Sequence, residues 1–349
     1  MRVIEQYCRG KRPDQSLNED GLAITDGFAA VVDGVTSKSI RHLWRPSGGV
    51  VAKNLALETI AALPASATMR QAQHAIDARF RRAYREYRGP YDDPYTIFEH
   101  EPIERLQANA VVYSAARREI WLFGDCQAMV NGEQIPTMKQ VDVLLGELRA
   151  FTTLALRRQD SGQTRHQPVF GAGATVRNTS ISCDDSGSNG DPSVFADAAV
   201  AADSADTVAS TDSADAVAPT NAADAAVSAN PADSAAPTDA ADPARAMIMP
   251  FLRLQSQFAN VRGPYGYFVF DGFTDSAYPI RTVTVRPGDE VVLASDGFPL
   301  LKPTLADSEA ALQRLKIKDP ALVSEYRSTK GFTPGYDSFD DRTYLRFVV

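Results

Sequence analysis

The sequence predicts an α+β fold in which sheets are covered by helices on their outer faces. Short apolar runs of about four to eight residues, rich in Val, Ile, Leu and Phe, recur in both halves of the chain and read as buried strands. Helical stretches come between groups of these runs, so the alternation is too irregular for a Rossmann or TIM arrangement. The connections between neighbouring strands are short enough for antiparallel pairing.

The first half of the chain supplies six strands and three helices in this interpretation. Its strands are expected near 2–8, 21–25, 28–33, 109–115, 119–124 and 127–131. Asn131-Gly132 marks a tight turn just after the last of these. Its helices are expected at 48–63, 69–87 and about 138–158.

The second half supplies a further set of elements. A helix is expected near 247–259, with two short helices at 305–316 and 319–328. Strands are expected near 265–270, 279–285, 290–295 and 343–348. Neither half has a complete set of strands, so we expect one domain over residues 1–349.

A segment of unusual composition interrupts this domain at about 184–243. It is rich in Ala, Asp, Ser, Thr and Pro, and Phe195 is its only aromatic residue. Such a segment buries too little apolar surface to offset its ordering entropy, which is about 1–2 kcal/mol per residue for the backbone. We expect a disordered insertion in a surface loop.

The charge of the chain is unevenly distributed. The net charge is −8, but residues 178–244 contain 12 Asp and no Lys, Arg or Glu, so the remainder carries +4. A mildly basic folded part suits an anionic substrate and does not form a nucleic-acid patch. Three widely spaced cysteines, the lack of an apolar leader and the absence of an 18-residue apolar stretch predict a cytoplasmic protein without membrane contact. We expect a monomer.

Four apolar runs, far apart in the sequence, end in aspartate. They end at Asp33-Gly34, at Asp125, at Asp296-Gly297 and, before the last strand, at Asp340-Asp341. A carboxylate at the end of a buried strand is costly unless its charge is compensated. Each Asp-Gly alone would be a turn, which is our interpretation of Asp20-Gly21, Asp26-Gly27 and Asp271-Gly272. The four strand ends together predict carboxylates gathered around a shared cation.

Mg²⁺ and Mn²⁺ are the cations that such a site would take, because they prefer hard oxygen ligands in octahedral geometry. Without a cation the clustered carboxylates would repel one another and most would be protonated. Two cations would keep them ionised and lower the pKa of a bridging water. The sequence therefore predicts a site for phosphoester hydrolysis.

The order of these motifs resembles the metal-dependent Ser/Thr phosphatases of the protein phosphatase 2C type. Asn18-Glu19-Asp20 resembles the family's "NED" element and Asp33-Gly34 its "DG" strand end. Gly124-Asp125, Ser295-Asp296-Gly297 and Asp340–Thr343 are similar to its "GD", "SDG" and "D-x-x-T" elements. The resemblance covers nearly the whole chain except the insertion. It implies a four-layer α-β-β-α sandwich of two mainly antiparallel sheets.

The resemblance also implies roles for individual residues. Asp33 would bridge two metal ions, with Glu19 and the Gly34 carbonyl on one of them. Asp296 and Asp340 would hold the other ion, and Asp125 with Asp296 a third, weaker one. Asp33 and Asp296 are the residues on which catalysis would depend, by attack of a metal-bridged hydroxide on phosphoserine or phosphothreonine of a protein substrate. Asp340 is preferred to Asp341 because Thr343 stands three residues after it.

The chain departs from the family pattern where phosphate is bound. Gln15 stands at the position of the family's phosphate-binding arginine, Val35 stands at the position of a histidine found in many eukaryotic members, and 36–39 replace a glycine pair. Arg12 and Lys38 are our candidates for phosphate contacts, with Lys11 and Arg41 as further sources of positive charge. These departures keep two alternatives open: a catalytically weak or inactive pseudophosphatase that acts as a binding module, and a phosphatase for a small phosphorylated metabolite.

Overall fold

The computed structural model describes residues 1–163 and 242–349, and both ranges fall in the same compact unit. The predicted insertion at about 184–243 lies outside the described residues, except for Asp242 and Pro243. Those two residues begin a helix. The assignment of residues 1–349 to one interrupted domain stays a prediction.

The strands form two antiparallel five-stranded sheets. The sheet that we call the β1 sheet has the order β1 (Arg2–Arg9), β10 (Arg342–Val348), β9 (Glu290–Ala294), β6 (Gln127–Val130) and β7 (Glu133–Ile135). The β3 sheet has the order β2 (Asp20–Ile24), β3 (Phe28–Gly34), β4 (Ala108–Ser114), β5 (Glu119–Phe123) and β8 (Arg281–Thr284).

Central strands of both sheets are buried on both faces, which explains their continuous apolar sequences. In β3, Ala29 and Val31 pack between the sheets, while Ala30 and Val32 face the helices. In β9, Val291 and Leu293 pack between the sheets, and their neighbours face outward into a second cluster. Successive side chains of a strand point to opposite faces, so one strand contributes to two apolar layers.

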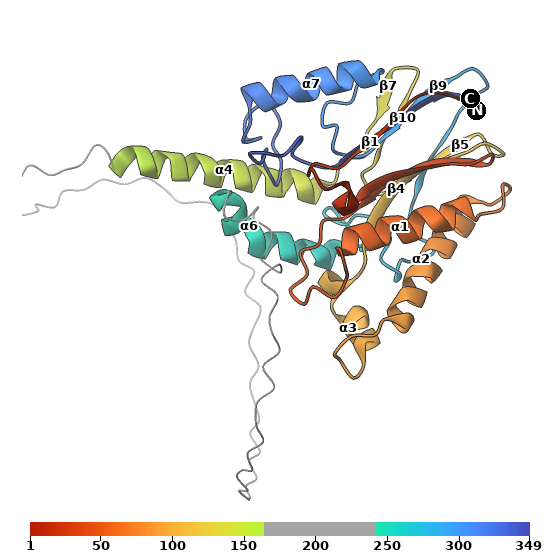
Figure 1. Ribbon diagram of the computed structural model, residues 1–349, viewed down its shortest axis with the longest axis horizontal. Coiled ribbons are helices and arrows are strands. Elements are labelled where there is room, and N and C mark those ends of the chain that lie inside the picture. Colours follow the sequence, from red (N-terminus) through yellow and green to blue (C-terminus); the bar gives the residue numbers. More distant parts are fainter. Residues whose placement is uncertain (164–241) are drawn as a thin grey trace, which may run out of the picture. The chain divides into compact units, whose positions relative to one another are not determined.

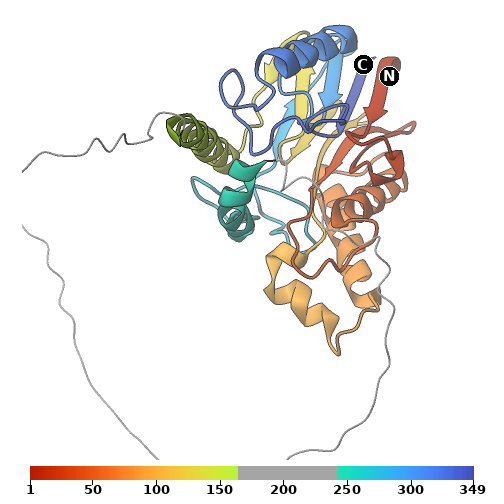
Figure 2. The same cartoon turned by 60° about the vertical axis from the view of Figure 1, so that its left-hand side comes forward.

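Helices cover the outer faces of the two sheets (Figure 1). The helices α1 (Gly48–Ala61) and α2 (Met69–Glu86) pack on the β3 sheet, and α7 (Leu305–Lys318) lies over the β1 sheet. Figure 2 shows the same succession of helix, two sheets and helix from another side. The predicted α+β class and its four-layer arrangement are confirmed.

Three further helices lie beside these layers. They are α3 (Pro94–His100), α4 (Gln140–Gln163) and α6 (Pro243–Leu254). Val141 and Leu145 of α4 pack against Ile248 and Leu252 of α6. Short 3₁₀ turns occupy Gln15–Leu17, Pro102–Glu104 and Gln255–Phe258. No helix in the described ranges is long and apolar enough to cross a membrane.

Two of the predicted elements are wrong. Residues 319–328 form turns, because the Asp319 carboxylate accepts the N–H groups of Val323, Ser324 and Glu325 and Leu322 has φ of 51°. Residues 265–270 form only isolated bridges, one of them between Ala108 and Phe270. The helix α3 and the short strand β7 were not predicted, and each spans seven residues or fewer.

Candidate metal centre

The carboxylates predicted from strand ends gather at one edge of the two sheets. Asp33 is the penultimate residue of β3 and pairs in register with Asp20 of β2. Asp296 follows β9, and Asp340 lies just before β10. Since β9 and β10 are hydrogen-bonded neighbours, their antiparallel pairing brings the last two carboxylates to the same end.

Mutual repulsion within this cluster is strong. Burial raises the pKa of Asp33 well above its usual range, and four neighbouring carboxylates add to the rise, those of Asp296, Asp20, Asp125 and Asp340. Burial likewise raises the pKa of Asp296, with repulsion first from Asp340 and then from Asp125. The structure thus brings four of the predicted aspartates within electrostatic reach of one another.

Glu19 reaches the cluster from the segment before β2. Its carboxylate accepts hydrogen bonds from Thr36 Oγ1 and Ser47 Oγ, both at 2.7 Å. Ser47 also caps α1 by accepting the Val50 N–H at 3.1 Å. The helix N-terminus carries partial positive charge, so it favours a carboxylate there. Glu19 is therefore held by α1 with its side chain beside the strand ends.

A pair of glycines allows this close approach of α1. A Cβ atom on Gly49 would lie 2.6 Å from Glu19 Oε1 and 2.7 Å from the Gly34 carbonyl oxygen. A Cβ atom on Gly34 would lie 2.0 Å from the Gly49 carbonyl oxygen. Gly48-Gly49 begin α1 after the loop that contains residues 36–39. The carbonyl of Gly34 and the carboxylate of Glu19 thus adjoin the same point.

Lys11 and Lys330 extend their ammonium groups into the cluster. Lys11 Nζ lies 3.0 Å from Asp340 Oδ1, 3.5 Å from Asp341 Oδ2 and 3.7 Å from Glu19 Oε2. Lys330 pairs with the other oxygen of Asp340. Burial alone would raise the pKa of Asp340, but the two ammonium groups outweigh burial and hold that pKa below its usual value.

Asp125 has a lysine of its own. Lys139, just before α4, places Nζ 2.7 Å from Asp125 Oδ2 and 5.0 Å from the centre of the Tyr267 ring. The other oxygen, Asp125 Oδ1, is buried without a hydrogen-bond partner in the described residues. Gly124, with φ of 95°, makes the sharp turn that points Asp125 back toward the cluster, and a Cβ atom there would lie 2.1 Å from Asn109 Oδ1.

Asp20 is a member of the cluster that the sequence interpretation missed. It was assigned to a turn, whereas the structure places it in β2 opposite Asp33. Its side chain is buried, and Oδ2 has no hydrogen-bond partner in the described residues. Burial, followed by repulsion from Asp341, raises its pKa to about 7. Its place directly after Glu19 and the register of β2 with β3 are the signals that could have identified it.

Asp341 has a structural role, which agrees with the preference for Asp340 as a ligand. Its Oδ1 accepts the Lys11 N–H at 2.7 Å and its Oδ2 accepts the Glu19 N–H at 2.9 Å. These bonds tie the N-terminal segment to the start of β10. Both oxygens of Asp341 are thereby engaged by backbone donors.

The oxygen ligands of the cluster are of the type that a hard divalent cation binds. The positions of the carboxylates do not form a complete coordination sphere. Carboxylate and carbonyl oxygens are the ligands that Mg²⁺ and Mn²⁺ prefer. Among the described residues, Asp20 Oδ2 and Asp125 Oδ1 are buried without hydrogen-bond partners. In the part of the chain that the structure describes, however, no group of three or more His, Cys, Asp and Glu side chains could hold a metal ion as it stands.

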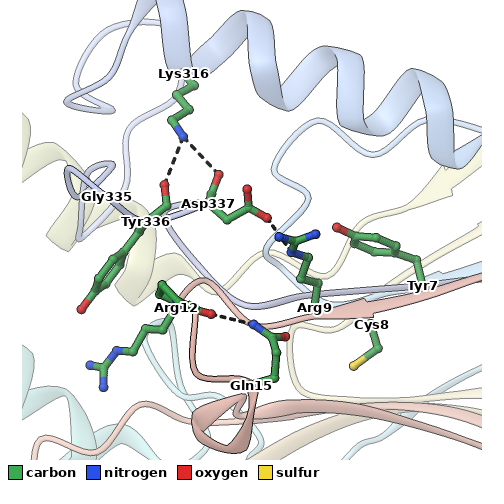
Figure 3. A pocket seen from close by; sticks show the side chains of 10 residues that line it. Tyr7, Cys8, Arg9, Arg12, Gln15, Lys316, Gly335, Tyr336 and Asp337 are labelled. Atoms are coloured by element: carbon green, nitrogen blue, oxygen red, sulfur yellow. Dashed lines mark hydrogen bonds and ion pairs between the residues drawn. The ribbon is translucent and has the colours of Figure 1, made fainter.

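The candidates for phosphate binding differ in how their side chains are engaged. Gln15 is bonded to the backbone of its own loop, donating to the Arg12 carbonyl at 2.6 Å and accepting the Gly10 N–H at 2.8 Å. Figure 3 shows the Arg12 guanidinium turned away from Gln15 and toward the side of Tyr336. Arg41 pairs with Glu101 at 2.7 Å, so its charge is already engaged.

Lys38 lies in a basic environment next to the cluster. Burial lowers its pKa to about 8, and the cations of Arg245, Lys330 and Lys139 contribute to the lowering. Arg12 has a buried Nε without a hydrogen-bond partner in the described residues. Both side chains line the same cavity, which extends from the cluster.

Val35 and Cys126 have no part in this chemistry. Val35, at the position of the histidine in many eukaryotic family members, packs against the apolar cluster of α4 and α6. Cys126 is buried between the sheets, and burial raises the pKa of its thiol well above the usual value.

Solved structures of bacterial Ser/Thr phosphatases are similar to this chain at low identity. The catalytic domain of the phosphatase PstP, in complex with two manganese ions, is 11% identical with a TM-score of 0.40, and the match covers 99% of this chain and 98% of that one. The phosphatase MsPP from Mycobacterium smegmatis, in complex with cacodylate, is 13% identical with a TM-score of 0.39 over all of both chains.

RsbX in complex with magnesium is 10% identical with a TM-score of 0.36, covering 99% and 97% of the two chains. No family model and no curated protein sequence matches this chain.

Proposed function

We propose that this chain is a Mg²⁺- or Mn²⁺-dependent phosphatase of the protein phosphatase 2C type that hydrolyses phosphoserine and phosphothreonine in proteins. The observation that carries the proposal is the convergence of buried carboxylates whose charge is incompletely balanced. Both sheets contribute to it, through residues that are distant in sequence.

A count of charges supports two cations. Seven carboxylates belong to the cluster, those of Glu19, Asp20, Asp33, Asp125, Asp296, Asp340 and Asp341. Three ammonium groups contact it, those of Lys11, Lys139 and Lys330. Four negative charges remain while Lys11 contacts the cluster, and five once Lys11 turns toward a substrate, so two divalent ions would neutralise most of them. Burial first, and repulsion between the carboxylates second, raise the pKa values of Asp33, Asp296 and Asp20.

The ligands proposed for the two ions are those that the resemblance to the protein phosphatase 2C type implies. Asp33 would lie between them. Glu19 and the Gly34 carbonyl would face one ion, and Asp296 with Asp340 the other. When bound, the ions supply Lewis-acid activation of water and neutralise charge on the phosphoryl group. Asp125 would hold a further ion only if Lys139 left it.

The side chains of the protein would orient the phosphoryl group. Lys38 and Arg12 are the proposed phosphate contacts, because their cations face the cavity next to the cluster. Lys11 lies close to both the carboxylates and this cavity, so it would turn from Asp340 toward the substrate once cations replace it.

The hydrolysis of p-nitrophenyl phosphate tests the proposal. Protein freed of metal by a chelator should be inactive and should recover with Mn²⁺. Asp33→Asn and Asp296→Asn should each lower kcat/KM at least about 100-fold, which corresponds to about 3 kcal/mol of transition-state stabilisation. Asp26→Asn, in an exposed turn, is the matched control. Full activity in chelated protein would contradict metal dependence.

A pseudophosphatase is the second candidate, and the lysines favour it. Lys11 and Lys330 already neutralise Asp340, and Lys139 neutralises Asp125. Such a chain would recognise a phosphorylated partner without turnover. Calorimetric binding of Mn²⁺ together with no hydrolysis of any phosphopeptide or metabolite phosphate would support this candidate over the first.

A further inference from the structure

A large cavity, which we call the basic groove, opens beside the candidate metal centre. It has a volume of about 990 Å³ and is lined by the loop after β3, by α4, by α6 and by the segment 320–339. Lys11 and Lys330 line it and also contact Asp340. The groove is therefore continuous with the cluster of carboxylates, and it is much larger than one phosphoryl group.

Cations dominate the lining of the basic groove. Besides Lys11 and Lys330, they include Arg12, Lys38, Arg157 and Arg253. The carboxylates that line it are those of Asp160 and Asp242, and Asp242 is already paired with Arg149 at 2.5 Å. Arg12 Nε is buried without a hydrogen-bond partner among the described residues. This concentration of positive charge occurs in a chain whose net charge is −8.

The length of the basic groove can be estimated from α4. The α4 residues that line it stand at positions 149, 153, 156, 157 and 160, which lie on one face of the helix. Eleven residues of helix rise about 16 Å. An extended chain of about five residues has the same length.

Apolar side chains accompany the cations along the groove. Leu156 of α4, Met249 of α6 and Phe332 contribute to its walls. A groove with this length, with charge on several elements and with apolar surface between the charges is suited to an extended peptide. A small phosphorylated metabolite would leave most of it unoccupied.

We propose that the basic groove binds the residues that flank the phosphorylated residue, and that it selects substrates in which these flanking residues are acidic or are themselves phosphorylated. This inference rests on the proposed phosphatase function and specifies the substrate class of the same site. Arg157 and Arg253 would contact the flanking acidic groups, farther from the metal centre than Lys38.

Two synthetic peptides test the selection. Each contains one phosphothreonine, with three glutamates on either side in one peptide and three glutamines in the other. Each exposed ion pair changes affinity by up to about fivefold, so kcat/KM should favour the acidic peptide about tenfold at low salt. The preference should shrink as the salt concentration rises.

A pair of double variants assigns the preference to the groove. In Arg157→Gln/Arg253→Gln the ratio of the two kcat/KM values should fall to about two or less. Arg79→Gln/Arg82→Gln, which removes the same charge from α2, should keep the wild-type ratio. Because both peptides are measured on each protein, differences in folding or metal content cancel in the ratio.

Several results would overturn the proposal. One is equal kcat/KM for the acidic and the glutamine peptide, and another is a ratio of these two values that Arg157→Gln/Arg253→Gln leaves unchanged. A third is inhibition by a nucleoside triphosphate of the hydrolysis of both peptides, when glutamate and glutamine flanks give the same rate. If neither peptide nor p-nitrophenyl phosphate is hydrolysed, the proposed function has failed instead. In that case, fluorescence anisotropy measures the affinity of Asp33→Asn protein for the two labelled peptides. Equal affinities would overturn the proposal that the basic groove selects acidic flanks.

Discussion

Lys139 holds its ammonium group 2.7 Å from the carboxylate of Asp125, at a position where the family resemblance places a third metal ion. Both side chains are about nine-tenths buried. The Lys139 ammonium group therefore neutralises the Asp125 carboxylate in place of an additional cation. The chain should therefore bind two ions. A third ion should not bind at Asp125 while Lys139 is paired with it.

Removing the ammonium group of Lys139 tests whether this lysine takes the place of a third metal ion. Lys139→Met should lower the free energy of unfolding of the metal-free protein by about 3 kcal/mol, because Asp125 loses its buried partner. Added Mn²⁺ should restore much of the loss and bind with one more equivalent than in the wild type. Calorimetric titration measures both affinity and stoichiometry.

Lys318→Met, at the exposed end of α7, is the control for the lost positive charge. An unchanged number of Mn²⁺ ions in Lys139→Met would contradict the role assigned to Lys139.

Replacement of Asp20 should stabilise the metal-free protein and weaken its binding of Mn²⁺. Asp20→Asn removes one negative charge from a cluster in which burial, followed by repulsion from Asp341, raises the pKa of Asp20 to about 7. The variant should therefore melt at a higher temperature than the wild type in the presence of a chelator. Its affinity for Mn²⁺ should fall about tenfold, as for losses of groups that support metal ligands.

Thermal melting with chelator and with Mn²⁺ separates these two effects of Asp20→Asn. A variant that is destabilised under both conditions would show that Asp20 acts only in packing.

The glycine pair at the start of α1 offers a matched comparison. Gly49→Ala places a methyl group 2.6 Å from Glu19 Oε1, so it should destabilise the fold by about 2 kcal/mol and weaken Mn²⁺ binding. Gly48→Ala meets no atom closer than 3.8 Å and should be tolerated, since alanine favours the helix. Urea unfolding of the two variants measures the difference. Equal stability would contradict the close approach of α1 to Glu19.

Asp77 in α2 should make stability depend on pH away from the metal centre. It accepts hydrogen bonds from the Gly272 N–H at 3.1 Å and from Thr274 Oγ1. Burial, with repulsion from Asp271, raises its pKa to about 7. Because the folded-state pKa is above the unfolded value of about 4, its stabilising contribution is complete below about pH 4 and is lost as the pH rises through 7.

Asp77→Asn should remove this loss, which amounts to at most about 4 kcal/mol. Urea unfolding at pH 5 and pH 8 should show a smaller decline in the variant than in the wild type. Asp26→Asn, in an exposed turn, should decline as the wild type does. A parallel decline of Asp77→Asn would mean that Asp77 is ionised in the folded protein at both pH values.

The strand-end aspartates could be predicted from sequence because their signal is local. An apolar run followed by Asp-Gly marks both the strand and its end, as at Asp33 and Asp296. The order of the sheets then places these ends together. The four layers could be expected for the same reason, since strands such as β3 are apolar on both faces.

The counter-ions of the cluster could not be predicted from sequence. Lys11 and Asp340 are 329 residues apart, and no local pattern distinguishes Lys11 from a surface lysine. Lys139 follows a short strand that was not predicted, and its pairing with Asp125 depends on where α4 begins. The glycine pair was missed because residues 35–47 separate it from Gly34. Residues 319–328 were misjudged because one carboxylate, that of Asp319, organises a turn where composition allows a helix.

Diffraction from crystals soaked in Mn²⁺, with the manganese located by its anomalous scattering, tests whether the carboxylate cluster is a metal centre for two ions. We expect two manganese peaks next to Asp33. One should lie beside Glu19 and the Gly34 carbonyl, and the other beside Asp296 and Asp340. Lys11 should have left Asp340. A map without peaks at these strand ends, with Lys11 still bonded to Asp340 and Glu19, would contradict the assignment of this cluster as a metal centre.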